Sequence, residues 1–284
     1  MLRIPALSLA TLIGVAVPAQ QQASALLARL QRAAEEAPLV VAHRGASADA
    51  PENTLAALRL AKAAGADVIE FDVYQTKDGA WVVLHDATVD RTTDVVAKLG
   101  RKKVRIDELS LDEARSLDAG AWFDAKFAGE KLPTLAEAIE AILPAVPMIE
   151  RKGGDPKALV AELQRLQVAD QVLVQAFDWD WLEQVHAAAP ELLLGALSGG
   201  EPTADKLRDV DRTGAKIVHW DHRTVTVDTA AAVRTASRML CVYTVDPDLA
   251  LVGAAAIGCD MVTTNRPAHM IELRRRGALR RPRQ

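Results

Sequence analysis

The sequence predicts an α/β fold in which eight parallel strands and the helices between them close into one (β/α)8 TIM barrel. Short, nearly continuous apolar runs rich in β-branched residues alternate with alanine-rich stretches whose apolar residues recur at helical spacing. Such strands are typical of a parallel sheet that helices cover on both faces. The eight runs are LVVAH (39–43), DVIEFDV (67–73), PMIER (147–151), QVLVQAF (171–177), LLLGAL (192–197), KIVHW (216–220), LCVYTV (240–245) and DMVTTN (260–265).

The stretches between these runs support the helical half of this prediction. NTLAALRLAKAAGA, TLAEAIEAIL and DPKALVAELQRL begin at Asn, Thr or Asp, which are residues that cap the first turn of a helix. A doubly wound open sheet is the alternative architecture. HRGAS follows the first strand, however, where an open sheet of the dinucleotide-binding kind carries a glycine-rich fingerprint.

Composition restricts the classes of partner. The chain has 284 residues, of which 50% are hydrophobic and 25% charged, with a formal net charge of −4. A chain of this length buries a large core as one large domain or two smaller ones. The slightly acidic balance gives no reason to expect a nucleic-acid partner, because such proteins usually carry a basic face.

The N-terminal segment has the features of a secretory signal peptide. Arg3 precedes an apolar run over residues 4–19, and small residues suit cleavage after Ala19 or Ala25. A retained membrane anchor is the alternative, but the run is shorter than the ~20 residues that span a bilayer, and prolines interrupt it. We therefore expect a periplasmic or secreted protein without a stable membrane anchor, with a signal peptide over 1–25 and one catalytic barrel over 26–284.

Ionisable residues recur where the predicted strands end. His43 and Arg44 end the first run, Glu70 and Asp72 the second, and three further residues end the next two: Glu150, Lys152 and Asp178. In parallel architectures the ligand site lies at the carboxyl ends of the strands. Since buried strands rarely carry charge without a partner or a metal, we expect these side chains to meet at one site.

A hairpin is predicted after the second strand. Asp78-Gly79 lies between two β-like stretches, which is a strong signal for a two-residue turn. Counting inward from this turn places Asp72 opposite His85, with Cβ atoms ~4.5–5.5 Å apart. Glu70 and Asp72, two apart on one strand, point to the same face. The hairpin is thus expected to bring His85 back onto the carboxylates.

The chemistry of these residues suits a reaction at the phosphorus of a phosphate ester. Two histidines, His43 and His85, suit a general acid and base pair near neutral pH. The remaining residues divide by charge: the carboxylates Glu70, Asp72 and Glu150 form an oxygen cage for calcium or magnesium, and Arg44 and Lys152 suit an oxyanion such as phosphate. Together they suit metal-assisted attack on a phosphate ester.

These residues and their spacing resemble the glycerophosphodiester phosphodiesterase family. The resemblance covers most of the chain after the predicted signal, through AHRGASADAPENT (42–54), EFDVYQTKDGAWVVLHDATVDRTTD (70–94), LPTLAEAI (132–139), IERK (149–152), YTVD (243–246) and GCDMVTTNRP (258–267). It implies a barrel that cleaves glycerophosphodiesters to glycerol 3-phosphate and an alcohol with one divalent cation.

The resemblance also implies roles for individual residues, and an inserted region over about 87–132. The implied roles are catalytic for His43 and His85, phosphate-binding for Arg44 and Lys152, and metal-binding for Glu70, Asp72 and Glu150. Glu52 and Asn53, from the Glu-Asn-Thr motif, are expected to order the loop and the start of the first helix. Two alternatives stay open: a lipid-directed phosphodiesterase of the lysophospholipase D or sphingomyelinase D type, and a non-catalytic barrel that binds a phosphorylated ligand.

The sequence departs from the family pattern at two strand ends. Arg151 replaces an apolar residue between Glu150 and Lys152, and strand alternation predicts that it faces outward. Ala176 stands where the family usually has serine, which removes a hydroxyl group from that strand.

Three other features have ordinary explanations. His219 and His222 could suggest zinc, but no accompanying ligand pattern supports it, so pocket lining or a satisfied loop is expected. Cys241 and Cys259 lie in apolar runs and are expected to be buried hydrophobes, although export would permit a disulfide. The basic C-terminal tail RRRGALRRPRQ is expected to be solvated, with attraction to an anionic lipid surface as the alternative.

Overall fold

The computed structural model describes residues 19–281, with side chains from residue 25 onward. Most of the predicted signal peptide therefore lies outside the described residues, and its last part begins helix α1 (Ala19–Ala33). Among the described residues, no helix has the length and apolarity needed to cross a membrane.

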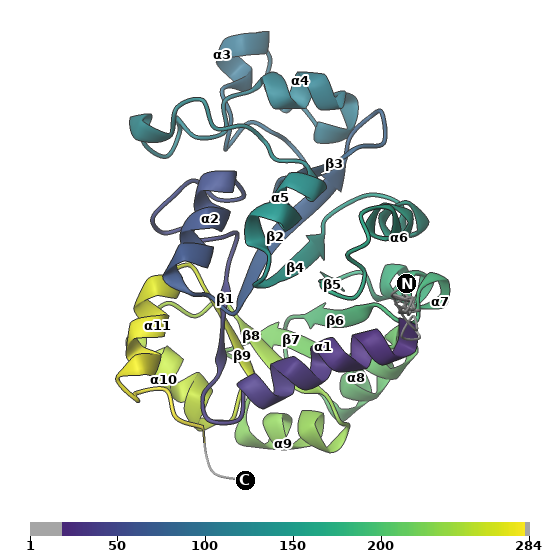
Figure 1. Ribbon diagram of the computed structural model, residues 1–284, viewed down its shortest axis with the longest axis vertical. Helices are drawn as coiled ribbons and strands as arrows, with labels where there is room; N and C mark the ends of the chain where they lie inside the picture. The colour runs from purple at the N-terminus through teal and green to yellow at the C-terminus, as the bar shows by residue number, and fades with distance from the viewer. Residues whose placement is uncertain (1–18, 282–284) are drawn as a thin grey trace, which may run out of the picture.

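Eight parallel strands form a closed barrel, as the sequence predicts (Figure 1). Each strand pairs with the next one along the chain, and β1 closes the ring by pairing with both β2 and β9. All eight predicted runs are strands. Their bounds are β1 (Leu39–Ala42), β2 (Val68–Gln75), β4 (Val146–Arg151), β5 (Leu173–Ala176), β6 (Leu193–Ser198), β7 (Ile217–Asp221), β8 (Met239–Tyr243) and β9 (Met261–Thr264).

Helices surround this barrel (Figure 1), and polar side chains begin several of them as expected. Thr54 accepts a hydrogen bond from the amide of Ala57 at the start of α2, and Asp155 accepts one from Ala158 at the start of α6. The helices that follow the barrel strands in turn are α2 (Leu55–Ala64), α5 (Leu135–Ile142), α6 (Pro156–Arg165), α7 (Trp179–Ala188), α8 (Ala204–Asp209) with the 3-10 turn η3 (Val210–Thr213), α9 (Val227–Thr235), α10 (Asp248–Ala256) and α11 (Pro267–Arg275).

The inward-facing residues of β2 and β4 change from apolar to charged along the barrel axis. On β2, the apolar Val68 near the amino end is followed on the same face by Glu70 and Asp72. On β4, Met148 is followed by Glu150 in the same way. On these two strands the interior is thus apolar at the amino end and charged at the carboxyl end.

Helix α1 covers the amino end of the barrel. Leu26 and Leu30, which are 5% and 3% exposed, belong to the same apolar cluster as the inward-facing Val41, Met148 and Ile217. Figure 1 shows α1 lying across this end of the strands. Either predicted cleavage position leaves these two leucines in the mature chain.

The predicted hairpin exists, but its predicted register is wrong by one residue. Strand β3 (Trp81–Val83) pairs with β2 so that Gln75 faces Trp81, and the amide of Leu84 donates to the carbonyl of Asp72 at 3.0 Å. Asp72 is therefore opposite Leu84 and not opposite His85. The loop has three residues, 77–79, instead of the expected two.

The side chain of Thr76 explains the longer loop. The amide of Thr76 donates to the carbonyl of Ala80 at 2.8 Å, and the amide of Ala80 donates back to the hydroxyl of Thr76 at 3.0 Å. Gly79 follows the turn with a φ of +83°, a left-handed conformation that favours glycine. These bonds pair Thr76 with Ala80 and fix the register.

The segment between β3 and α5, which contains the predicted insertion, has a hydrophobic core of its own. It comprises α3 (Val95–Leu99), η1 (Ile106–Glu108), α4 (Leu111–Ser116) and η2 (Ala125–Phe127). Leu84, Val104 and Leu117 belong to this separate cluster and are almost fully buried. Figure 1 shows the segment beyond the carboxyl end of β2, so it lies on the side of the barrel where the charged residues gather.

Candidate active site

Three carboxylates lie together at the carboxyl end of the barrel. Glu70, Asp72 and Glu150 are 1%, 1% and 7% exposed, and each offers an oxygen within 4.8 Å of those of the other two. One oxygen of each carboxylate is buried without a well-directed hydrogen bond. Such an arrangement has the charge and the oxygen ligands that a hard divalent cation requires.

Electrostatics make this cluster unfavourable without a cation. Burial, together with repulsion by Asp72 and Glu150, raises the pKa of Glu70 well above its ordinary value. Burial and Asp72 also raise the pKa of Glu150. The protein thus holds two carboxyl groups, Glu70 and Glu150, that resist carrying their charges beside Asp72.

A tight turn places Arg44 beside the carboxylates. Arg44 has a φ of +55°, and its amide donates to Glu70 Oε2 at 2.8 Å. Gly45 continues the turn with a φ of +81°, and a Cβ there would lie 2.5 Å from the backbone of Ala57. The His-Arg-Gly motif is therefore explained by a left-handed turn packed against α2, which only glycine fits.

Arg44 and Lys152 contact the acids through their charged groups. Arg44 Nε lies 3.4 Å from Asp72 Oδ2, and Lys152 Nζ lies 3.3 Å from Asp72 Oδ1 and also contacts Glu150. Although burial by itself lowers it, the pKa of Lys152 is raised by Asp72 and Glu150. Both side chains are about one-fifth exposed, so they remain accessible from the barrel mouth.

Asn53 holds Asp72 more directly than the sequence predicts. Its Nδ2 donates to Asp72 Oδ2 at 2.8 Å, and its Oδ1 accepts from the amide of Asp72 at 3.2 Å. The neighbouring Glu52 accepts hydrogen bonds from Arg44 at 2.8 Å and from Arg91 at 2.8 and 2.9 Å. The Glu-Asn pair thus orients the charged groups, while Thr54 after it begins α2.

His43 lies at the end of β1 with its ring orientation fixed. Its Nδ1 lies 2.7 Å from Asn265 Oδ1, and Asn265 Nδ2 donates to Asp246 Oδ2 at 2.6 Å. Because the amide nitrogen is used by Asp246, the amide oxygen accepts, and His43 Nδ1 must carry the proton. Burial lowers the pKa of His43, and Arg44 lowers it further. His43 is thus a neutral imidazole with Nε2 free.

His85 reaches the same mouth despite the corrected register. It lies two residues beyond the end of β3, and Arg91 links its partner Asp86 to Glu52, which also binds Arg44. Its Nδ1 lies 2.6 Å from Asp86 Oδ1, and Arg91 Nε donates to the other oxygen of Asp86 at 2.6 Å. Although burial alone would raise it, hydrogen bonds from Arg91 and His85 lower the pKa of Asp86 to about 2. His85 therefore faces a permanent carboxylate.

Comparison with known proteins identifies the family. The sequence profile of the glycerophosphoryl diester phosphodiesterase family matches residues 43–269. The chain belongs to this family. The predicted resemblance and the enzyme class, a phosphoric diester hydrolase, are confirmed.

Three relatives illustrate the match. A glycerophosphodiester phosphodiesterase of Caldanaerobacter subterraneus subsp. tengcongensis is 41% identical over 167 residues, covering 56% of this chain and 66% of that relative. One from Bacillus subtilis is 30% identical over 253 residues, covering 81% and 84%. The structure of an Oleispira antarctica phosphodiesterase in complex with the product sn-glycerol-3-phosphate superposes with a TM-score of 0.75 at 28% identity, covering 83% of this chain and 96% of that one.

His219 and His222, the two histidines that could suggest zinc, have hydrogen-bond partners within the protein. His219 is 2% exposed, its nitrogens lie 2.7 Å from Gln175 Oε1 and 3.0 Å from Thr263 Oγ1, and burial lowers its pKa to about 3. His222 Nδ1 lies 3.1 Å from the carbonyl of Tyr243. Neither histidine joins a metal-binding group among the described residues.

The structure also tests the predictions for Asp178, Arg151 and the two cysteines. Asp178 caps α7 and pairs with Arg151 at 3.1 Å, so it does not join the carboxylate cluster. Arg151 also lies over the ring of Trp181, which confirms that it faces outward. Cys241 and Cys259 are both buried and free, as expected for small hydrophobes.

The partners of the two histidines are what the sequence reasoning missed. Asn265 and Asp246 hold His43, while Asp86 and Arg91 hold His85. The available signal was that Asn265 ends the last predicted strand, at the same barrel end as His43. Asp86 directly follows His85 and could have been proposed as its partner.

Proposed function

We propose that this enzyme hydrolyses glycerophosphodiesters to sn-glycerol 3-phosphate and an alcohol, with one calcium or magnesium ion. The observation that carries the proposal is the joint presence of two oriented histidines and a buried cluster of three carboxylates at one barrel mouth. A barrel that only binds a phosphorylated ligand has no need for two histidines whose Nδ1 atoms are both held by a hydrogen-bond acceptor.

The cation would be held by Glu70, Asp72 and Glu150. Their close buried oxygens and the raised pKa values of Glu70 and Glu150 support a hard cation with oxygen ligands, since its charge would remove the repulsion between the acids. When bound, the ion supplies Lewis-acid stabilisation of charge on the phosphate oxygens.

The two histidines have complementary proton-transfer roles. His43 is neutral, with a lowered pKa and a free Nε2, so it accepts the proton of the attacking hydroxyl group. Attack by water gives glycerol 3-phosphate directly, whereas attack by the substrate's own glycerol hydroxyl gives a cyclic phosphate that a water molecule then opens. His85, whose ring is oriented by the contact of its Nδ1 with Asp86, donates the proton to the leaving alkoxide. The P–O bond to the alcohol breaks as that proton is delivered.

Arg44 and Lys152 bind the non-bridging phosphate oxygens. Both are cationic, both reach the mouth, and the guanidinium fork of Arg44 suits two oxygens at once. Their contacts with Asp72 place the phosphate beside the carboxylate cluster.

A lipid-directed activity is the second candidate, because the mouth has an apolar rim. Phe177 follows β5 and is 52% exposed, with its ring centroid 6.0 Å from that of Tyr243 in an edge-to-face arrangement. A pair made of an exposed and a half-buried aromatic ring offers a surface to an acyl chain as well as to a small head group.

One assay distinguishes these candidates. Glycerol 3-phosphate release from glycerophosphocholine and choline release from lysophosphatidylcholine are measured with calcium, with magnesium and with excess chelator. The proposed function expects the first reaction to dominate, to stop in chelator and to be strongly reduced in Asp72→Asn. Dominant choline release would favour the lipid-directed enzyme, and full activity in chelator would reject the metal.

We further propose that residues 1–25 direct export. Arg3 and the apolar run of residues 4–19 support this proposal. Expression of the full chain in a bacterium with two membranes, followed by fractionation and N-terminal sequencing, should give a periplasmic protein that begins at residue 20 or 26. An intact N-terminus in the cytoplasm would reject it.

A further inference from the structure

A second polar hollow lies at the opposite end of the barrel from the carboxylates. It has a volume of about 1120 Å³ and includes residues that precede or begin strands, such as Ala37 before β1, Met239 at the start of β8 and Asp260 before β9. The end of α1, the end of α9 and the segment from α11 to the C-terminus provide its other walls. Nothing in the proposed hydrolysis uses this pocket.

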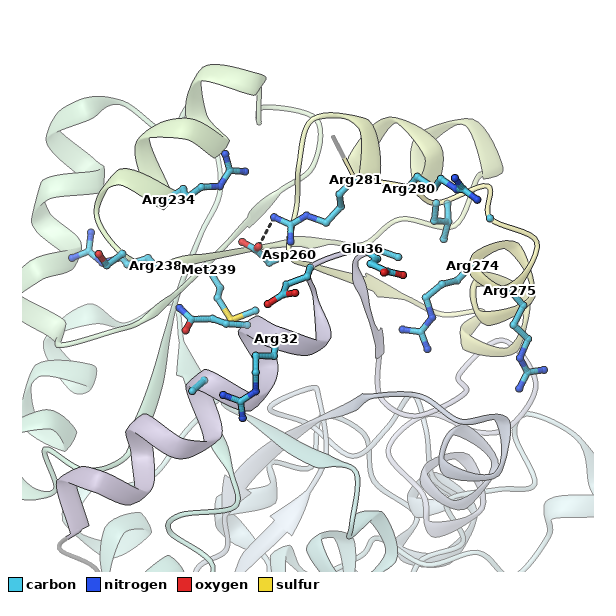
Figure 2. A pocket seen from close by; sticks show the side chains of 17 residues that line it. Arg32, Glu36, Arg234, Arg238, Met239, Asp260, Arg274, Arg275, Arg280 and Arg281 are labelled. Carbon is cyan, nitrogen blue, oxygen red and sulfur yellow. Dashed lines mark ion pairs between the residues drawn. The ribbon is translucent and has the colours of Figure 1, made fainter. Parts of the chain in front are cut away.

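Arginine dominates the lining of this basic pocket. Three carboxylates contribute to the same lining: Glu35, Glu36 and Asp260. Figure 2 shows the arginine side chains around the hollow, with Glu36 and Asp260 among them. The seven arginines are Arg32, Arg234, Arg238, Arg274, Arg275, Arg280 and Arg281.

Three of these arginines have carboxylate partners. Arg281 lies 2.6 Å from Asp260, and the other two pairs are Arg238 with Asp211 and Arg274 with Asp67. The remaining four form no ion pair within residues 25–281: Arg32, Arg234, Arg275 and Arg280. The hollow therefore holds more positive charge than its own acids neutralise, in a chain whose overall charge is −4.

The wall of the pocket is built around a buried arginine. The side chain of Arg281 is only 4% exposed, donates to the carbonyl oxygens of Ala34 and Gly258, and leaves its Nε buried without a partner. Arg234 approaches the same place, since a Cβ on Gly258 would lie 3.0 Å from Arg234 Nη2. Two guanidinium groups thus converge on Gly258 with Asp260 as their nearest acid.

We propose that this basic pocket binds phosphate groups, which are supplied either by a soluble phosphate compound or by the head groups of anionic lipids. Guanidinium groups match the geometry of phosphate oxygens and bind them through charge-assisted hydrogen bonds. The uncompensated arginines come from α1, α9 and the C-terminal segment, so a bound phosphate would connect three parts of the chain. The volume exceeds what a single phosphate ion fills, and several phosphates or a head group fit it.

The test compares two triple variants of the full enzyme that change the net charge equally. The pocket variant is Arg32→Gln, Arg234→Gln and Arg275→Gln, which leaves the structural Arg281 in place. The control variant is Arg29→Gln, Arg165→Gln and Arg276→Gln, three exposed arginines outside the pocket lining. Any phosphate that binds at the barrel mouth binds both variants alike, so it does not affect the comparison.

Two probes distinguish the sources of phosphate. Calorimetric titration with pyrophosphate measures soluble binding, and cosedimentation with phosphatidylglycerol-phosphatidylcholine vesicles, against pure phosphatidylcholine, measures lipid binding. Each basic residue near an anionic group contributes on the order of five-fold in affinity, so the pocket variant should bind at least one probe roughly a hundred-fold more weakly than the control variant.

The result for each probe assigns the ligand or rejects the site. Selective loss of pyrophosphate binding identifies a soluble phosphate compound, and selective loss of vesicle binding identifies a lipid head group. Equal binding by the two variants, or no binding by the parent enzyme, overturns the proposal. Both variants should hydrolyse glycerophosphocholine like the parent, because the pocket lies at the other end of the barrel, and thermal unfolding followed by circular dichroism verifies that both are folded.

Discussion

At the amino end of the barrel the inward-facing side chains are apolar and α1 covers them, whereas at the carboxyl end the same rows of β2 and β4 carry charge. On β2 the row passes from Val68 to Glu70 and Asp72, and on β4 it passes from Met148 to Glu150. Both ends are buried, so exposure to water does not distinguish them. They differ in whether burial stabilises the fold or opposes it.

This contrast shows how the barrel supports an unfavourable site. Burial of apolar side chains at the amino end stabilises the fold by ~25 cal/mol per Å² removed from water. Burial at the carboxyl end raises the pKa values of Glu70 and Glu150 and disfavours their charged forms. Substitutions at the two ends should therefore have separable effects, on activity at one and on stability at the other.

The largest expected effect is on activity at the carboxyl end. His43→Ala removes the proposed base, and loss of general acid-base catalysis should reduce turnover of glycerophosphocholine by ~10²–10⁴-fold. The melting temperature should stay close to that of the parent, because His43 lies at the mouth and its removal opens no cavity in the core. His222→Ala, outside the carboxylate site, is the control. Near-parental turnover in His43→Ala would remove His43 from the mechanism.

The opposite result is expected at the amino end. Leu30→Ala empties a buried site beneath the strands and should lower the free energy of unfolding by about 2–5 kcal/mol, while turnover per folded molecule stays near the parent value. Urea unfolding and initial rates at 25 °C measure the two quantities. A variant with parental stability would show that α1 does not support the barrel. Leu249→Ala, at a leucine that is 89% exposed, is the matched control.

The partner of His85 should have a smaller effect. Asp86→Asn keeps an acceptor near His85 Nδ1 but removes the negative charge from the hydrogen bond that orients the ring. The kcat should fall by roughly ten-fold while KM stays near the parent value, because a charge-assisted hydrogen bond is stronger than a neutral one. Asp112→Asn, on the surface of α4 in the same inserted segment, should leave kcat unchanged. An unchanged kcat in Asp86→Asn would reject Asp86 as the residue that positions the proposed acid.

The contrast between the two ends also explains what the sequence could predict. The eight strands are predictable because burial on both faces leaves uninterrupted apolar runs, and the shared face of Glu70 and Asp72 follows from the two-residue period of a strand. Both are local properties of the chain. The carboxylate cluster follows from them once the strands are known to be parallel.

What could not be predicted depends on contacts that local patterns do not contain. The hydrogen bond of His43 with Asn265 joins residues 222 positions apart, and only closure of the barrel brings them together. The hairpin register depended on whether Asp78-Gly79 formed a two-residue turn or part of a three-residue loop. The hydroxyl of Thr76 decided this by accepting from the amide of Ala80.

The smallest expected effect concerns stability at the carboxyl end, and it depends on pH. Glu70 and Glu150 have raised pKa values in the folded, cation-free protein and ordinary ones when unfolded. For a raised pKa, the contribution to stability is present below the unfolded value and is lost as pH rises through the folded value. In chelator, the protein should therefore lose stability from about pH 5 to pH 8 relative to a variant without this repulsion.

A bound cation should remove this loss, because its charge replaces repulsion between the acids with attraction to the ion. The difference in melting temperature between calcium and chelator should thus increase from about pH 5 to pH 8, since binding only the folded protein stabilises it and deprotonated carboxylates bind the ion better. Glu70→Gln removes one of the repelling charges, so it should weaken both the pH dependence in chelator and the effect of calcium. Glu140→Gln, which changes an exposed carboxylate on α5, should preserve both. A calcium effect that is constant or decreasing with pH would contradict the view that this barrel end is held in an unfavourable state until a cation binds.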